Sequence, residues 1–255
     1  MTEKNTISAD YTAAPGSFRG RVVLVTGAAG GIGNAVCRQL AAAGATLVLL
    51  DKEIKPLERL YDRIIEAGDP EPAIYPMNLE GASFDHFPEV GQRIHAELGR
   101  LDALLHAAAA LGKPAPLELY DVEAWYRTLQ VNLNAPFMLT RACLPLLRQA
   151  DQSAVLFTSD HGGRYGAPYG GAYAVANAGI EGMMRVLAAE MADTTTVRVN
   201  SLDPGVVGTA LRAQAFPFEN PFELRRPEQV AGAFVRLLGP DGREFHGQAL
   251  TIAEH

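Results

Sequence analysis

A glycine-rich segment near the start of the chain, Thr26–Gly33, has the residue types and spacing of a phosphate-binding turn. It follows the apolar run Val22–Val25 and opens directly into a helical pattern. Gly27 permits the positive φ of a tight turn, Gly31 leaves no Cβ between backbone and ligand, and Gly33 lets the helix pack closely on the strand. The unpaired N–H groups of the first helical turn carry positive partial charge, so they suit a pyrophosphate.

A carboxylate stands at the end of the next apolar run. Residues 45–50 form that run and Asp51 follows it, at a distance from the glycines that suits hydrogen bonds to the hydroxyls of an adenosine ribose. The alternative is an ordinary strand-to-helix turn of an α/β protein. The order of strand, glycine turn, helix, strand and acid favours a dinucleotide site.

Apolar runs alternate with longer amphipathic segments along the whole chain, and this alternation predicts the elements that position the turn. The expected strands are 22–26, 46–50, 73–77, 103–106, 154–158, 198–202 and 248–252. The expected helices are 32–43, 55–67, 84–98, 122–149, 173–192 and 227–238. We therefore expect an α/β fold, a Rossmann-like doubly wound parallel sheet of about seven strands with helices on both faces.

We expect one catalytic domain over residues 21–255, preceded by a ragged N-terminal arm over residues 1–20. Pro136 and Pro145 interrupt the fourth helical pattern, which predicts a bend or a frayed end there. The stretch 204–227 is loop-like and rich in phenylalanine and proline. It is either a lid of a substrate pocket or a packed surface loop.

Composition limits the partners. The chain has 255 residues, 48% hydrophobic and 20% charged, which is a globular composition, and its net charge of −7 argues against nucleic acid or an anionic membrane as partner. No apolar run approaches the roughly 20 residues that span a bilayer, and no signal-peptide core is present. Cys37 and Cys143 fall in helical patterns, which suits a reducing compartment, and we expect a cytoplasmic protein. No spacing of histidine and cysteine predicts a metal site.

From about Arg21 to Glu254, the chain resembles the short-chain dehydrogenases/reductases. The segments that carry the resemblance are Thr26–Gly33, Val131-Asn132-Leu133, Tyr173 at the opening of a helix, and Asn200 through Pro204-Gly205 to Thr209. Within the family, the segments most similar to the YciK-like bacterial group are 137–140, 144–147, 181–184 and 215–217. The resemblance implies a Rossmann-type sheet, an NAD or NADP cofactor, hydride transfer between a carbonyl and an alcohol of a small molecule, and a homodimer or homotetramer.

The resemblance implies cofactor-binding roles for Thr26, Gly27, Gly31, Ile32, Gly33, Asp51, Asn78, Leu79, Ala107, Val207 and Thr209. Asp51 matches the ribose-binding acid and would repel the 2′-phosphate of NADP, although Lys52 could partly offset that repulsion, so we expect NAD. Asn78 replaces an aspartate that contacts the adenine amino group and can accept the same hydrogen bond. Val207 and Thr209 match positions that hold the nicotinamide carboxamide.

The catalytic residues of the family are only half matched. Tyr173 matches the tyrosine that transfers the proton, and Asn132 matches the asparagine that anchors a water. The position of the lysine that lowers the tyrosine pKa holds Asn177, and the position of the serine that binds the substrate carbonyl holds Asp160. Without a cation and beside a carboxylate, the pKa of a tyrosine moves upward, so Tyr173 is expected to be a poor base. The turn motif Asn-Asn-Ala-Gly reads His106-Ala107-Ala108-Ala109.

Several replacements for the missing groups remain open. Ser159 could serve if the loop shifts by one residue, although on a regular strand its side chain would face the opposite way. His161 could form an acid–base pair with Asp160, Lys113 could reach the site from another loop, and Asp160 could bind a cationic or amine-bearing substrate. The sequence thus favours an oxidoreductase with an altered proton relay. The alternative is an impaired relative that binds dinucleotide as a sensor, scaffold or partner subunit, and a lyase or dehalogenase-like relative ranks last.

Overall fold

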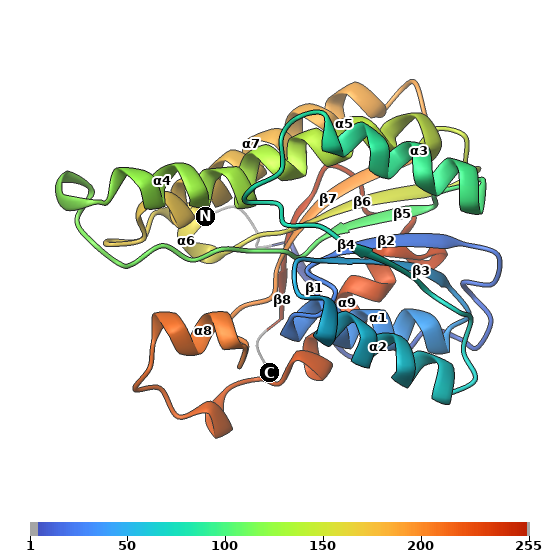
Figure 1. Cartoon of the computed structure of the whole chain (residues 1–255), viewed down its shortest axis with the longest axis horizontal. Helices are drawn as coiled ribbons and strands as arrows, with labels where there is room; N and C mark the ends of the chain where they lie inside the picture. Colours follow the sequence, from blue (N-terminus) through green and yellow to red (C-terminus); the bar gives the residue numbers. More distant parts are fainter. Residues whose placement is uncertain (1–4, 254–255) are drawn as a thin grey trace.

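A computed structural model describes residues 5–253 and shows one parallel sheet between two layers of helices (Figure 1). The strands are β1 (Thr6–Ile7), β2 (Val22–Thr26), β3 (Thr46–Asp51), β4 (Ala73–Pro76), β5 (Ala103–His106), β6 (Ser153–Thr158), β7 (Val197–Asp203) and β8 (Ala249–Ile252). Their order in the sheet is β1-β8-β7-β6-β5-β2-β3-β4. Chain order reverses between β2 and β5, and ligands of such sheets bind at this switch point, outside the carboxyl ends of the strands.

Each face of the sheet has its own helical layer (Figure 1). One layer holds α1 (Gly31–Ala42), α2 (Ile54–Glu66) and α9 (Pro227–Leu238), and the other holds α3 (His86–Leu98), α5 (Ala135–Leu147) and α7 (Gly171–Met191). The short helices are α4 (Val122–Leu129), α6 (His161–Tyr165) and α8 (Ala210–Ala215). Successive residues of β2 serve the two layers alternately, because Val23 and Val25 pack with α1 and α9 whereas Leu24 packs with α3 and α5. None of the described helices is long and apolar enough to cross a membrane.

The N-terminal arm corrects two predictions. Over its described part, residues 5–20, the arm is packed on the domain rather than ragged, because β1 pairs with β8 and Phe18 is fully buried. A Cβ on Gly232 would overlap the carbonyl oxygen of Tyr11, so only glycine lets the arm lie this close to α9. The sheet therefore has eight strands rather than about seven. A two-residue edge strand has no apolar run that would reveal it in the sequence.

A buried arginine, Arg198, holds strand β7 against the C-terminal end of α9. Arg198 of β7 donates from Nη1 to the carbonyl oxygens of Leu237 (2.9 Å) and Gly242 (2.7 Å), and from Nη2 to that of Gly239 (2.9 Å). Burial lowers the pKa of Arg198 to about 10, so the guanidinium stays charged at neutral pH. Its charge lies at the negative end of the α9 dipole, which compensates it without a carboxylate.

Candidate dinucleotide and substrate site

The glycine turn after β2 has the geometry of an open anion site. Gly27 has φ of 66°, and a Cβ there would lie 2.7 Å from the Cα of Ala108. A Cβ on Gly33 would overlap the carbonyl oxygen of Gly27, and one on Gly31 would lie 2.9 Å from Cγ2 of Thr209. The N-cap residue of α1 is Gly30, which has no side chain that could cap the helix. Its first N–H groups are therefore free to bind a phosphate, so the residues present fit a dinucleotide.

Thr26 ties the glycine turn to the turn after β5. Its Oγ1 accepts the N–H groups of Ala107 and Ala108, each at 3.2 Å. The two bonds join the carboxyl ends of β2 and β5 at the switch point. They place Ala107 beside the glycine turn, where the family resemblance expects cofactor contact.

Asp51 lies against the glycine turn. Its Oδ2 accepts the N–H of Ala29 (3.1 Å) and its Oδ1 accepts that of Lys52 (2.7 Å). Leu79 is buried, whereas Asn78 is exposed and its Oδ1 accepts a backbone N–H two residues further on (3.1 Å). The structure thus brings the carboxylate of Asp51 to the edge of the glycine turn, and the amide of Asn78 lies further from it.

The segment from Val207 to Phe222 borders the start of α1. Val207 is buried and pairs with Arg225, and Thr209 caps α8 by accepting the N–H of Arg212 (3.2 Å). Beyond it, α8 stands apart from both helical layers (Figure 1). Phe218 and Phe222 are fully exposed on this segment. The segment has unburied aromatic surface, which favours a lid over a packed loop.

Tyr173 lies in the first turn of α7, and the uncharged Asn177 follows it one helical turn later. Burial, and secondly the nearby Asp160 carboxylate, raise the pKa of Tyr173 above its ordinary value, while hydrogen bonding from Asn177 and the charge of Arg212 oppose this rise. The Nδ2 of Asn177 also donates to the backbone oxygen of Tyr173 (3.0 Å). The hydroxyl of Tyr173 is therefore held protonated at neutral pH.

Asn132 occupies a π-helical turn, Gln130–Asn134, that joins α4 to α5. This turn interrupts the long helix expected over 122–149. Both polar atoms of the Asn132 side chain are used, since Oδ1 accepts the N–H of Ala110 and Nδ2 donates to its carbonyl oxygen, each at 2.8 Å. Asn132 thus fixes the loop that follows β5.

Ser159 faces away from Tyr173. Its Oγ donates to Oε1 of the buried Glu181 at 2.5 Å. The same carboxylate accepts from Arg164 Nε (2.7 Å) and from Ser201 Oγ (2.9 Å). Ser159 therefore belongs to a buried polar cluster that joins α6, α7, β6 and β7, and the alternating strand geometry that argued against its use at the site agrees with this placement.

The Arg164–Glu181 pair was not predicted from the sequence. The only sequence signal is spacing, since Tyr173, Asn177 and Glu181 follow one another at four-residue intervals on α7. Asp203 was also missed, although it ends β7 directly before Pro204.

Asp203 is 4% exposed and its Oδ1 accepts the N–H of Gly205 at 2.8 Å. Burial raises the pKa of Asp203, and Asp160 adds to the rise while Arg164 and the Gly205 N–H oppose it. Asp160 caps α6 by accepting the N–H of Gly162 through Oδ1 (2.7 Å). Two carboxylates therefore lie at the carboxyl ends of β6 and β7.

The other candidate groups are placed elsewhere. The ring of His161 packs on that of Tyr165 (centroids 4.6 Å apart), and no hydrogen bond joins it to Asp160 among residues 5–253. Lys113 is exposed on the loop after β5 and forms no ion pair with the described residues. Within the same range no group of acidic, histidine and cysteine side chains is arranged to hold a metal ion.

His106 is a buried, neutral side chain at the end of β5. Its ring stacks on Phe157 (4.9 Å between centroids, 5° between planes), and its Nε2 lies 2.8 Å from Oγ1 of Thr140. Burial lowers the pKa of His106 from 6.5 to about 3. It supplies no positive charge to the site.

The lowered pKa of His106 predicts that the folded protein loses stability at acidic pH. Between the folded value near 3 and the unfolded value of 6.5, the unfolded chain binds the proton more tightly. The stabilisation is therefore complete above pH 6.5 and is lost as the pH falls, by up to about 1.4 kcal/mol per pH unit. His106→Gln keeps an amide near Thr140 but has no such titration. Urea unfolding of both proteins from pH 7 to pH 4 is expected to show the wild type losing more stability, and parallel curves would contradict the assignment.

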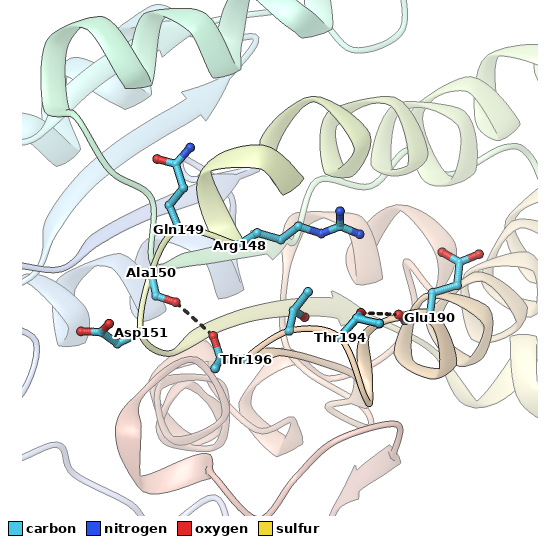
Figure 2. A pocket seen from close by; sticks show the side chains of 8 residues that line it. Arg148, Gln149, Ala150, Asp151, Glu190, Thr194 and Thr196 are labelled. Atoms are coloured by element: carbon cyan, nitrogen blue, oxygen red, sulfur yellow. Dashed lines mark hydrogen bonds between the residues drawn. The ribbon is translucent and has the colours of Figure 1, made fainter.

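A depression of about 750 Å³ lies at the opposite end of the sheet (Figure 2). It is lined by Arg148, Gln149, Ala150, Asp151, Glu190, Thr194, Thr195 and Thr196. These residues lie just after α5 and at or just after the end of α7, and Thr196 Oγ1 donates to the Ala150 carbonyl oxygen (3.0 Å). The depression is open, polar and remote from the glycine turn, so we do not assign the dinucleotide to it.

A parallel doubly wound sheet with an open glycine turn and a carboxylate at its edge defines a Rossmann-type dinucleotide-binding protein. The chain belongs to the short chain dehydrogenase family, whose family model matches residues 21–220. The family is one of oxidoreductases that use a nicotinamide dinucleotide, NAD(P), and act on small molecules.

Similar proteins include bacterial oxidoreductases and short chain dehydrogenases. An uncharacterized oxidoreductase of Escherichia coli K12, YciK, is 38% identical over 227 residues, which are 89% of this chain and 89% of that protein. A solved short chain dehydrogenase from Pseudomonas syringae is 45% identical, with a TM-score of 0.92 over 95% of this chain and 98% of that one. Another solved structure, from Shigella flexneri and complexed with NADP, is 36% identical. Its TM-score is 0.90, and the match covers 93% of this chain and 99% of that one. These matches confirm the fold class and the YciK-like group predicted from the sequence.

Proposed function

We propose that the chain is an NAD-dependent oxidoreductase that transfers a hydride between a carbonyl and an alcohol with an altered proton relay. The observation that carries the proposal is the open N-terminus of α1 with Asp51 hydrogen-bonded to the glycine turn. The bound nicotinamide supplies or accepts the hydride. The chain's own residues bind its phosphates at Gly31–Gly33, its ribose at Asp51, and its carboxamide at Val207 and Thr209.

Tyr173 has the role of proton donor in the reductive direction. A carbonyl oxygen that receives a hydride on its carbon must gain a proton, and the hydroxyl of Tyr173 is the protonated group at this edge of the sheet. Because its pKa is raised by burial and by Asp160, proton donation is slow, and proton abstraction from an alcohol is slower still. The proposal therefore predicts weak turnover of simple ketones.

The first experiment follows nicotinamide absorbance with a panel of ketones and alcohols, in the wild type and in Tyr173→Phe. We expect measurable ketone reduction by the wild type and at least about a tenfold loss in the variant. Dinucleotide binding, followed by fluorescence, serves as the control for folding. Tight binding with no turnover of any substrate would instead support the second candidate, an impaired relative that binds dinucleotide as a sensor, scaffold or partner subunit. The observation that favours this candidate is the uncharged Asn177 beside Tyr173.

NAD rather than NADP is proposed because the carboxylate of Asp51, which is hydrogen-bonded to the glycine turn, would repel a 2′-phosphate. We expect NADH to bind more tightly than NADPH, and Asp51→Ala to weaken NADH and strengthen NADPH, shifting the preference by about tenfold or more. Glu53→Ala, an exposed acid two residues away, is the matched control and should leave the ratio unchanged. Equal or tighter NADPH binding by the wild type would contradict the proposal, and the NADP complex of the Shigella flexneri relative makes this comparison necessary.

We also propose a cytoplasmic homodimer or homotetramer. Exposed apolar side chains on α4, α5 and α7 support assembly, among them Tyr126, Phe137 and Val186. The free, buried Cys37 and Cys143 are compatible with a reducing compartment. Sedimentation of the whole chain measures the assembly directly.

A further inference from the structure

Two carboxylates approach the region of Tyr173 from neighbouring strands. Leu202 of β7 pairs with Thr158 of β6. Asp203 directly follows Leu202 and Asp160 lies two residues after Thr158, so both acids emerge at the same edge of the sheet. Both carboxylates act on Tyr173, since each contributes to raising the pKa of its hydroxyl. The site itself is defined independently of these acids, by the glycine turn and the family fold.

Short contacts fix the position of Asp160. It caps α6, and α6 packs so closely on α7 that a Cβ on Gly163 would overlap the side chain of Asn177. Asn177 lies one helical turn beyond Tyr173. The cap therefore holds the Asp160 carboxylate at the junction of α6 and α7, beside the position where the family has its lysine.

Asp203 has an unused acceptor. The side chain is 96% buried, because only 4% is exposed, and Oδ1 accepts the N–H of Gly205. No described residue donates a hydrogen bond to Oδ2. Oδ2 is not one of the fully buried polar atoms that lack a partner among the described residues, so it remains accessible to a ligand. A carboxylate oxygen in that position binds a positively charged or N–H-bearing group strongly.

The nearby cations of the chain are already paired. Arg164 is bound to Glu181 at 2.7 Å and is 9% exposed, so it belongs to the buried cluster. Arg212 is bound to Glu219 and lies over the ring of Phe216 at 3.7 Å. Arg164 and Arg212 therefore offset only part of the negative potential, since the pKa values of Asp203 and Tyr173 both stay above their ordinary values.

The negative electrostatic potential beside Tyr173 determines which class of substrate the site favours. When a hydride adds to a carbonyl carbon, negative charge develops on oxygen, and the catalytic site must supply positive charge or hydrogen-bond donors. When a hydride leaves a carbon bonded to nitrogen, positive charge develops on that nitrogen, and carboxylates stabilise it. A site with two carboxylates, whose nearby arginines are bound to other acids, is suited to the second reaction.

We propose that the substrate of this site carries its reacting carbon on a nitrogen, so that the chain interconverts an amine and an iminium ion, with Asp160 and Asp203 as the specificity-determining residues. In the oxidative direction the C–H bond of the amine breaks and its two electrons and hydrogen pass as hydride to oxidised nicotinamide dinucleotide. The nitrogen lone pair forms the C=N bond, giving the iminium cation. The reverse reaction adds hydride to the iminium carbon and yields a neutral amine. Neither direction needs a proton from Tyr173, which explains how the site functions without the lysine.

The inference rests on the proposed hydride transfer but not on a carbonyl substrate. The test compares N-methylpyrrolinium, a permanently charged iminium, with cyclopentanone as its carbonyl counterpart, both with the reduced cofactor. We expect kcat/KM for the iminium to exceed that for the ketone by at least about tenfold. Asp160→Asn, which preserves the helix cap and the shape, is expected to lower the iminium value at least about tenfold without lowering the ketone value. Asp151→Asn, at the other end of β6, is the matched control and should change neither.

A binding measurement gives a second readout without turnover. N-methylpyrrolidinium, a saturated cation, is titrated into the complex with oxidised cofactor by ligand-observed NMR. We expect binding to the wild type and at least about tenfold weaker binding to Asp160→Asn. A ketone reduced faster than the iminium, or an iminium rate unchanged in Asp160→Asn, would overturn this inference and leave the proposed function standing. No turnover of either compound by protein that binds the dinucleotide would overturn both.

Discussion

Replacing Arg164 with methionine is expected to lower the free energy of unfolding by about 3–5 kcal/mol. The substitution leaves the carboxylate of Glu181, which is 3% exposed, buried without its cation. The hydroxyls of Ser159 and Ser201 still donate to it, but two neutral donors do not replace a full positive charge. Urea unfolding at neutral pH measures the difference.

Arg185 provides the control for this prediction, because it faces the same carboxylate. Its Nη1 lies 3.9 Å from Oε2 of Glu181, but its side chain is 62% exposed. Arg185→Met is therefore expected to change the free energy of unfolding by less than about 1 kcal/mol. The double substitution Arg164→Met with Glu181→Gln should recover part of the loss, since it removes the unpaired charge. Equal effects of the two arginine substitutions would show that burial of the pair is not what stabilises this cluster.

The double substitution Asp160→Ser with Asn177→Lys is expected to raise kcat for ketone reduction by about 100-fold. The ammonium lowers the pKa of Tyr173, and the removal of Asp160 abolishes the carboxylate that raises it. The serine also donates to a carbonyl oxygen and still caps α6. Steady-state reduction of cyclopentanone measures the gain.

Each single substitution is expected to give a smaller gain than the pair. With Asn177→Lys alone, the new ammonium is partly neutralised by Asp160; with Asp160→Ser alone, no cation is supplied. Unchanged dinucleotide affinity controls for folding, since position 177 is only 6% exposed and contacts Gly163. If the wild type turns over ketones as fast as the double variant, the altered relay is not the limitation that we infer.

The order of strands and helices and the glycine turn could be read from the sequence because each depends on local pattern. The run Val22–Val25 is apolar at every position since both faces of the sheet are covered, and Gly27 is required by its positive φ. The π-helical turn at Asn132 and the edge strand Thr6–Ile7 have no such pattern. Both depend on contacts with distant parts of the chain.

The chemistry of the site was only partly predictable for the same reason. Counting back from Tyr173 identified Asp160, and counting forward identified Asn177. Strand alternation predicted the direction of the Ser159 side chain, but its partner Glu181 is 22 residues away in sequence and is identified only by the structure. The burial of Asp203 depends on β6 and β8, the strands that lie on either side of β7. Sequence spacing thus identified which groups are missing, and the structure showed which charges remain.

The protonation state of Tyr173 tests the central claim most directly. The ultraviolet absorbance of tyrosinate is titrated in the wild type and in Tyr173→Phe, both with bound dinucleotide, and the difference isolates this hydroxyl. Burial and Asp160 keep its pKa above the ordinary 10.0, so we predict no difference between the two proteins up to about pH 10. A tyrosinate that forms near neutral pH in the wild type and is absent from the variant would contradict the account.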